Sequence, residues 1–199
     1  MKLEQRKRII SKHRDSLTRH GYSPNALYWS NRAVQETRFS ILASIGIEDT
    51  DSLLDVGCGF ADFKTWTDNI GINLKYTGID LSPDLIDVAK RLHPDATLIA
   101  GDLFEVDFPS SNFNWVVLSG ALNENLKDDG AYALKTITRM FQLSNKGVAF
   151  NLLDARQIQA HDLQSHQPAQ VMNHCYTLTK NCELCDDYLK NDFTIFMRR

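Results

Sequence analysis

Short β-type runs alternate with helical patterns over residues 52–153 of this 199-residue chain, and this order limits the possible folds more than any other feature. Strands are expected at 52–56, 74–80, 97–100, 113–118 and 147–153, and helices at 60–69, 85–92 and 130–143. Helices placed between successive strands predict parallel strands joined by right-handed crossovers. The expected fold class is therefore α/β, a doubly wound sheet with helices on both faces, in three αβα layers.

The end of the chain breaks this order. Residues 182–189 and 192–197 both have β character, and only Lys190 and Asn191 separate them. A gap of that length cannot hold a crossover helix, so we expect an antiparallel hairpin. The sheet is then mostly parallel and ends in an antiparallel strand.

The start of the chain is basic and periodic. Residues 1–20 hold seven Lys or Arg and two acidic residues, and an apolar residue recurs every seven positions, at Leu3, Ile10 and Leu17. This pattern is typical of an amphipathic helix that packs a thin apolar stripe against its domain. An arm that binds nucleic acid is the alternative interpretation.

A second helix is expected at 31–45, after a turn-rich stretch with three aromatic residues. We divide the chain into a helical extension or lid at 1–50 and one domain at 51–199. A single domain with an extension suits the length.

The composition excludes several classes of protein. The formal net charge is −3 and the pI is about 6.0, which argues against a protein that coats nucleic acid by charge alone. No run approaches 18 apolar residues and no secretory signal is apparent, so no membrane association is expected and the cytoplasm is the expected location. The late cysteines Cys175, Cys182 and Cys185 are expected on β structure as buried thiols, with no metal site.

The first expected strand ends in a glycine turn. The strand contains Asp55 and is followed by Gly57, Cys58 and Gly59. The two glycines let the backbone turn sharply and approach a ligand closely. A dinucleotide fingerprint requires a small residue at position 62, but Asp62 occupies it and would repel a diphosphate at the helix N-terminus. The turn favours a cationic nucleoside without phosphate, such as S-adenosylmethionine.

Two further acidic residues follow the next two strands. Asp80 ends the second strand, at the distance from Gly57 where a carboxylate accepts both ribose hydroxyls. Asp102 ends the third, where it can accept a hydrogen bond from an adenine amino group. Leu81 and Leu103 are expected to flank that ring, together with Phe104.

The segments 53–63, 76–90, 98–108 and 114–123, with the terminal hairpin, resemble the class I S-adenosylmethionine-dependent methyltransferases. The resemblance covers about residues 50–199 and implies a seven-stranded sheet whose last strand is antiparallel. Position 61 is alanine, where many members have a third glycine.

The resemblance also implies where the cofactor binds. Gly57, Cys58 and Gly59 would line its methionyl part, with Asp55 in the same turn. Asp80 would bind the ribose, and Asp102 with Leu103 the adenine. Ser119 and Gly120 would lie next to the reacting methyl group.

The stretch 20–39 resembles the lead-in of small bacterial methyltransferases of undefined substrate. Tyr28, Trp29 and Arg38 would then cover the cofactor and help to form the acceptor pocket. With Asn123 they are the catalytic candidates, although in-line methyl transfer does not require a catalytic side chain. Candidate bases are His20, Tyr22, Tyr28 and His161.

The residues after the fourth strand disfavour several classes of methyl acceptor. Residues 119–123 read Ser-Gly-Ala-Leu-Asn, which lacks the Asn/Asp-Pro-Pro-Tyr of amino methyltransferases acting on adenine or glutamine and the Pro-Cys of cytosine-carbon enzymes. The leading hypothesis is methyl transfer to an O, N or S atom of a small molecule, with nucleic acid disfavoured as a partner. The alternatives are an RNA methyltransferase that docks through residues 1–20, an S-adenosylmethionine-binding accessory protein without turnover, and an oxidoreductase. Asp62 disfavours the oxidoreductase, because it would repel the diphosphate of a dinucleotide.

Overall fold

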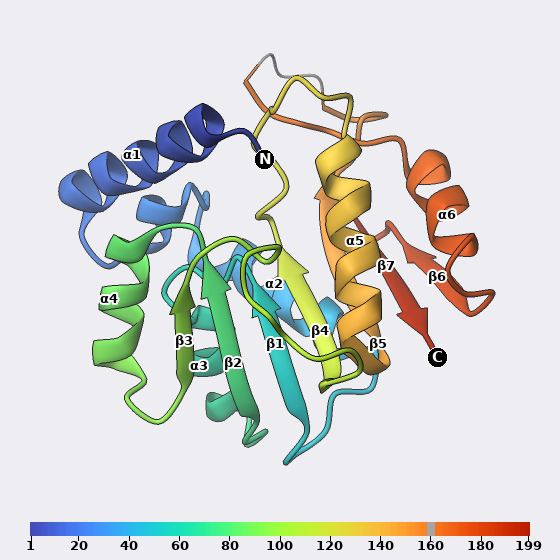
Figure 1. The fold of residues 1–199 in the computed structure, drawn as a ribbon, viewed down its shortest axis with the longest axis horizontal. Coiled ribbons are helices and arrows are strands. Elements are labelled where there is room, and N and C mark those ends of the chain that lie inside the picture. The colour runs from blue at the N-terminus through green and yellow to red at the C-terminus, as the bar shows by residue number, and fades with distance from the viewer. Residues whose placement is uncertain (159–161) are drawn as a thin grey trace.

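The computed structural model describes residues 1–158 and 162–199, which form one seven-stranded sheet flanked by helices (Figure 1). The strands are β1 (Ser52–Val56), β2 (Lys75–Asp80), β3 (Thr97–Ala100), β4 (Phe113–Ser119), β5 (Ser144–Leu153), β6 (Cys182–Cys185) and β7 (Asp192–Arg198). The helices are α1 (Leu3–His20), α2 (Arg32–Ala43), α3 (Asp62–Asn69), α4 (Pro83–Leu92), α5 (Ala131–Leu143) and α6 (Pro168–Tyr176), with a 3-10 turn η1 (Pro24–Leu27).

The strand order is β3-β2-β1-β4-β5-β7-β6. β1 to β5 pair in parallel, whereas β7 is antiparallel to both β5 and β6. The predicted fold class is therefore confirmed, including the antiparallel last strand. Within the described residues, no helix is long and apolar enough to cross a membrane.

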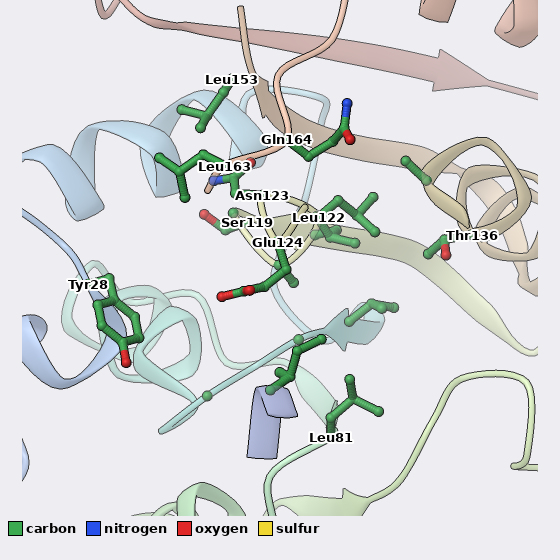
Figure 2. Close-up of a pocket in the computed structure, with 18 of the residues that line it drawn as sticks. Tyr28, Leu81, Ser119, Leu122, Asn123, Glu124, Thr136, Leu153, Leu163 and Gln164 are labelled. Atoms are coloured by element: carbon green, nitrogen blue, oxygen red, sulfur yellow. The ribbon is translucent and has the colours of Figure 1, made fainter. Parts of the chain in front are cut away.

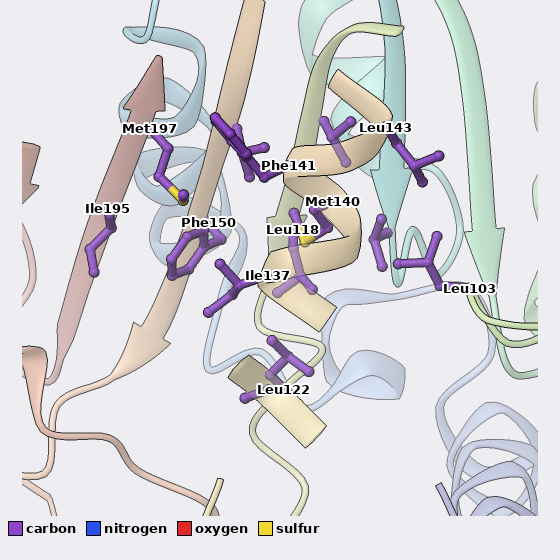
Figure 3. Packing of buried hydrophobic residues seen from close by; sticks show 14 of the residues in the cluster. Leu103, Leu118, Leu122, Ile137, Met140, Phe141, Leu143, Phe150, Ile195 and Met197 are labelled. Carbon is purple, nitrogen blue, oxygen red and sulfur yellow. The ribbon is translucent and has the colours of Figure 1, made fainter. Parts of the chain in front are cut away.

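The two faces of the sheet are covered by different helices. Successive residues of a strand point to opposite faces, and accordingly Leu53 of β1 packs in the cluster that contains Phe39, whereas Leu54 packs in the cluster that contains Ile137. The first cluster lies under α2, α3 and α4, and the second under α5 and α6. Figure 3 shows Ile137, Met140 and Phe141 of α5 packed against the second face.

The terminal hairpin differs from the prediction in its loop. β6 ends at Cys185, so six residues rather than two connect it to β7. Asp186 forms an ion pair with Arg156 at 2.6 Å, and the Tyr188 hydroxyl lies 2.8 Å from Thr194 Oγ1. Residues 186–191 are therefore held by side-chain contacts rather than by strand pairing.

Helix α6 was not predicted, and the expectation that Cys175 lies on β structure is wrong. Cys175 is buried in α6, whereas Cys182 and Cys185 lie on the edge strand β6 and are only partly buried, so the expectation of buried thiols is correct for Cys175 alone. Pro168 at the first helical position was the available signal, because proline is favoured there.

Helix α1 lies across the carboxyl ends of the strands, at the upper left in Figure 1. Four of its basic side chains form ion pairs with acidic residues of that edge: Arg6 with Glu105, Arg8 and Lys12 with Glu124, and Arg14 with Asp84. Its Leu17 packs on a small core of Ala26, Phe60 and Leu85. The basic residues of this helix therefore attach it to the loops that end the strands.

Candidate functional site

A cavity of about 680 Å³ opens at the carboxyl ends of β1, β2 and β4, beneath α1 (Figure 2). Twelve of the residues predicted from sequence line it: Gly57, Gly59, Asp80, Leu81, Asp102, Leu103, Ser119, Gly120, Tyr28, Trp29, Arg38 and Asn123. Its size is within the usual range for a site that holds a small-molecule ligand.

The turn after β1 requires its glycines. Gly57 has a φ of +74°, and a Cβ there would lie 2.2 Å from the Cβ of Ala121, in the loop after β4. Gly59 has a φ of +54°, and a Cβ there would lie 2.9 Å from Leu27. The turn after β1 thus packs closely against the loop after β4 at Gly57 and against η1 at Gly59, where a side chain would not fit.

Asp80 holds this turn from the end of β2. Its Oδ2 accepts a hydrogen bond from the backbone N–H of Gly59 at 3.0 Å, and its Oδ1 accepts one from the N–H of Ser82 at 2.8 Å. Each carboxylate oxygen has a second lone pair, and the side chain lines the cavity. The group therefore fits a ligand with two neighbouring hydroxyls, as on a ribose.

Asp102 lies at the next strand end and already has protein partners. The hydroxyl of Tyr132 lies 3.2 Å from each of its carboxylate oxygens, and the N–H of Phe104 donates to Oδ1 at 3.0 Å. Burial raises the pKa of Tyr132, and the carboxylate raises it further. The Phe104 ring packs edge-on to Tyr132, whereas Leu81 and Leu103 face the cavity.

Two predicted residues, Asp55 and Cys58, do not line the main cavity. They border a smaller space of about 30 Å³ that shares Gly57 and Ser119 with it. The Sγ of Cys58 points toward Gly78, 2.7 Å from where a Cβ would lie. The Cys58 side chain therefore points toward β2, which approaches closely at this glycine, and a contact of Cys58 with the cofactor stays a prediction.

Asp55 is buried on the sheet face covered by α2. It accepts a 2.6 Å hydrogen bond from the Tyr76 hydroxyl. Burial raises the pKa of Asp55 to about 7, and the nearby carboxylates of Asp80 and Asp62 raise it further, while the bond to Tyr76 opposes the shift. Asp55 therefore links β1 to β2 in the core, next to the glycine turn.

Asp62 has a structural environment that the sequence did not reveal. Its carboxylate accepts hydrogen bonds from Tyr22 at 3.1 Å, Arg32 at 3.0 Å and Gln35 at 2.9 Å. The side chain is 3% exposed. This charge is compensated within the protein and attaches the 22–35 segment to α3, so it does not offer a free anion to a ligand.

Ser119 and Gly120 end β4 opposite the glycine turn. Gly120 has a φ of +72°, and a Cβ there would lie 3.1 Å from Arg38 Nη1 and 3.5 Å from the ring of Trp29. Arg38 forms a buried bidentate pair with Asp192, at 2.6 and 2.5 Å, and stacks over the Trp29 ring at 4.7 Å. Arg38 therefore fixes the indole beside Gly120.

Asn123 and Tyr28 also line this cavity, and Figure 2 shows the Glu124 side chain extending toward Tyr28. Asn123 Oδ1 is buried and has no hydrogen-bond partner among residues 1–158 and 162–199. The Tyr28 hydroxyl donates to the backbone oxygen of Lys12 at 3.0 Å, and the Lys12 ammonium lies 4.6 Å from the Tyr28 ring while pairing with Glu124.

The candidate bases are not favoured by these contacts. His20 is exposed at the end of α1 and does not line the cavity, and Tyr22 donates to Asp62. His161 lies outside the described residues. His13 was not among the predicted residues, yet it lines the cavity, and its Nδ1 is buried with no hydrogen-bond partner in the part of the chain that the structure describes. Its spacing was a usable signal, because His13 follows Ile10 by three positions and precedes Leu17 by four.

Comparisons with known proteins find methyltransferases. The family model described as "Methyltransferase domain" matches residues 53–147. The protein named "Putative methyltransferase Rv1506c" from Mycobacterium tuberculosis is 28% identical over 169 residues, which cover 78% of this chain and 97% of that protein.

Two solved structures share the fold. A TehB-like SAM-dependent methyltransferase from Corynebacterium glutamicum is 16% identical with a TM-score of 0.64, and the match covers 100% of both chains. An N-methyltransferase of Haemonchus contortus, solved with phosphomonomethylethanolamine and S-adenosylhomocysteine, is 18% identical with a TM-score of 0.64, over 87% of this chain and 46% of that one.

Proposed function

Because the chain is a class I S-adenosylmethionine-dependent methyltransferase, we propose that it methylates an O, N or S atom of a small molecule held between α1 and the loop after β4. The observation that carries this proposal is that the same cavity is lined by Asp80, at the expected nucleoside side, and by Asn123 and Tyr28. Asn123 Nδ2 lies 3.6 Å from where a Cβ of Gly120 would be, beside the expected position of the methyl group.

S-adenosylmethionine supplies an activated methyl group on a sulfonium. We assign Asp80 to its ribose, Leu81 and Leu103 to the faces of its adenine, and Gly57, Gly59, Ser119 and Gly120 to its methionyl part. Asp55 and Cys58 act from beneath the turn. Asp102 is assigned to the adenine side, where Tyr132 orients its carboxylate.

The chain's own contribution to the rate is positioning and exclusion of water. Trp29, fixed by Arg38, and Tyr28, fixed by Lys12, form two walls at the acceptor side. Holding two reactants at near-attack geometry is worth up to roughly 7–11 kcal/mol. In this proposal the first 30 residues form a lid, because α1 and η1 bring Ile9, His13 and Leu27 to the cavity wall.

The ion pairs of α1 favour a small molecule over RNA. Arg6, Arg8, Lys12 and Arg14 face acidic residues of the domain, so these charges are not arranged as a patch for phosphates. An accessory protein without turnover is also less favoured, because it does not require an acceptor side with unpaired polar atoms such as Asn123 Oδ1.

The test is a methyl-transfer assay with labelled S-adenosylmethionine and two substrate sets. One set holds small phenols, thiols and amines, and the other is transfer RNA. We expect label in small-molecule products and S-adenosylhomocysteine binding by calorimetry. Label in RNA alone, with salt-sensitive RNA binding, would favour the alternative.

A further inference from the structure

We propose that the acceptor subsite is the part of the cavity over β4 and β5, and that it takes an uncharged molecule with an apolar body. This inference rests on the proposed function and names the class of acceptor that the proposed function leaves open. It is carried by three leucines that line the cavity, Leu122, Leu153 and Leu163, which we call the leucine wall.

The strand order places this subsite next to the expected cofactor. Along the sheet the strands follow as β3, β2, β1, β4 and β5. Asp102, Asp80 and Gly57, at the carboxyl ends of the first three, are the residues assigned to the cofactor. Gly120 follows β4 and Leu153 ends β5, so the cavity continues past the expected methyl position over these two strands.

The leucine wall combines three segments of the chain. Leu122 belongs to the loop after β4, Leu153 ends β5, and Leu163 belongs to the segment between β5 and α6. In Figure 2 all three lie in the upper half of the view, whereas Leu81 of the nucleoside side lies in the lower half. The wall is therefore separate from the residues that are expected to flank the adenine.

Backbone hydrogen bonds hold these segments together. The N–H of Gln164 donates to the backbone oxygen of Asn123 at 2.9 Å. The N–H of His166 donates to the backbone oxygen of Leu153 at 2.8 Å. These backbone groups are satisfied within the protein, so contact with a ligand at this wall falls mainly to the side chains.

The ion pairs at the cavity argue against a charged acceptor. Glu124 pairs with both Lys12 and Arg8. Arg38 forms a buried bidentate pair with Asp192. A carboxylate, phosphate or ammonium group on the acceptor would have to compete with these pairs, and it would lose water against apolar side chains.

Three further titratable side chains that line the cavity have other surroundings. Asp128 accepts hydrogen bonds from two backbone N–H groups at the start of α5. Asp162 is exposed, so water and salt screen its charge. The His13 ring packs edge-on against Tyr28, with 5.7 Å between the ring centroids. These contacts leave the leucine wall as the main surface for the body of the acceptor.

One polar group marks the reacting end of the acceptor. Asn123 Nδ2 lies 3.6 Å from where a Cβ of Gly120 would be, beside the expected methyl group. An amide N–H donates to a lone pair of an O, N or S atom. The acceptor therefore combines a heteroatom near Asn123 with an apolar body against the wall, as in pockets where a few polar groups fix the orientation of a ligand.

The first experiment compares three probes of similar length: hexanol, hexanoate and hexylammonium. Each is titrated by calorimetry into the full chain saturated with S-adenosylhomocysteine. We expect hexanol to bind roughly tenfold more tightly than either ion, or better. Butanol should bind roughly tenfold more weakly than hexanol, because burial of each methylene group is worth about fourfold in affinity.

Variants of Leu163 test the wall itself. Leu163→Asp should weaken hexanol binding by roughly tenfold or more and leave S-adenosylhomocysteine affinity unchanged. Leu163→Met keeps an apolar side chain of similar volume and should bind hexanol as the parent does. The matched control is Leu92→Asp on α4, because Leu92 is 42% exposed and is not among the residues that line the cavity.

NMR with labelled leucine methyl groups locates the probe. In the complex with S-adenosylhomocysteine, hexanol should give nuclear Overhauser effects to the methyl groups of Leu122, Leu153 and Leu163.

Four results would overturn the apolar subsite: binding of either ion as tightly as hexanol, hexanol affinity that Leu163→Asp does not change, hexanol contacts with other side chains alone, or binding of none of the probes. Failure to bind S-adenosylhomocysteine at all would instead contradict the proposed function itself.

Discussion

The carboxylate of Asp80 accepts a hydrogen bond from the backbone N–H of Gly59, so the end of β2 holds the glycine turn that follows β1. The bond is 3.0 Å long and joins residues 21 positions apart. One side chain therefore shapes the turn and also faces the cavity where a nucleoside is proposed to bind.

Asp80→Ala should weaken S-adenosylmethionine binding by one to two orders of magnitude, since the change leaves two ribose hydroxyls unpaired at roughly 1–3 kcal/mol in total. Isothermal calorimetry measures this directly. Asp87→Ala, an exposed position on α4, is the matched control and should bind as the parent does. Equal affinities for the two variants would contradict the assignment of Asp80.

Gly57→Ala should abolish cofactor binding while the sheet remains folded. The new Cβ would meet the Cβ of Ala121 at 2.2 Å, in a backbone conformation with a φ of +74° that alanine rarely adopts. Adding Ala121→Gly removes the collision and leaves the backbone strain, so the double variant should recover part of the affinity. Calorimetry and circular dichroism give the two readouts. A single variant that binds normally would show that the two loops are not coupled.

Asp55→Asn should change how stability depends on pH. The folded-state pKa of about 7 lies above the ordinary 3.8, so the folded protein retains a proton that the unfolded chain has lost. This contribution is present at low pH and is lost as the pH rises from about 4 to about 7, at a cost of up to roughly 4 kcal/mol. Asparagine mimics the protonated acid, so the variant should be more stable than the parent at pH 8.

Thermal unfolding at pH 5 and pH 8 checks this expectation. The melting temperature of the parent should fall further below that of Asp55→Asn at pH 8 than at pH 5, because most of the loss occurs between these two values. Asp87→Asn serves as the control for loss of a surface carboxylate. Parallel profiles for the parent and Asp55→Asn would mean that Asp55 is ionised in the folded state throughout this range.

Glu124→Gln should loosen the lid helix. Glu124 is paired with both Lys12 and Arg8, and such partly exposed pairs contribute about 1 kcal/mol or less and weaken with salt. Hydrogen exchange of α1 should become a few-fold faster in the variant, and salt should accelerate it in the parent more than in the variant. The control is Glu4→Gln on the exposed side of α1. Exchange that is insensitive to both Glu124→Gln and salt would contradict an electrostatic attachment.

The fold was predictable because it depends on local patterns. Ser82 caps α4 by accepting from the N–H of Leu85, with Pro83 at the first helical position, as the sequence indicated. The strand ends that bring Gly57, Asp80 and Gly120 together also follow from the alternation of strands and helices. The carboxyl ends of parallel strands lie at one edge of the sheet, and this placement depends on strand direction and not on side-chain identity.

The directions of the side chains at the site were harder to predict from the sequence. Asp55 lies on the same face of β1 as Leu53, so period-two alternation already indicated a core position, although the glycine motif suggested a ligand contact. The partners of Asp62 lie 27 to 40 residues away in the extension, and no local pattern indicates such a pairing. His13 was overlooked although it lies on the apolar stripe of its helix.

The most direct measurement is a crystal structure of the chain with S-adenosylhomocysteine. The account predicts the ribose hydroxyls on Asp80, the adenine between Leu81 and Leu103, and the sulfur near Gly120, facing the side lined by Asn123 and His13. A nucleoside bound elsewhere, or the same cavity filled by a dinucleotide whose diphosphate lies on the 57–59 turn, would contradict it.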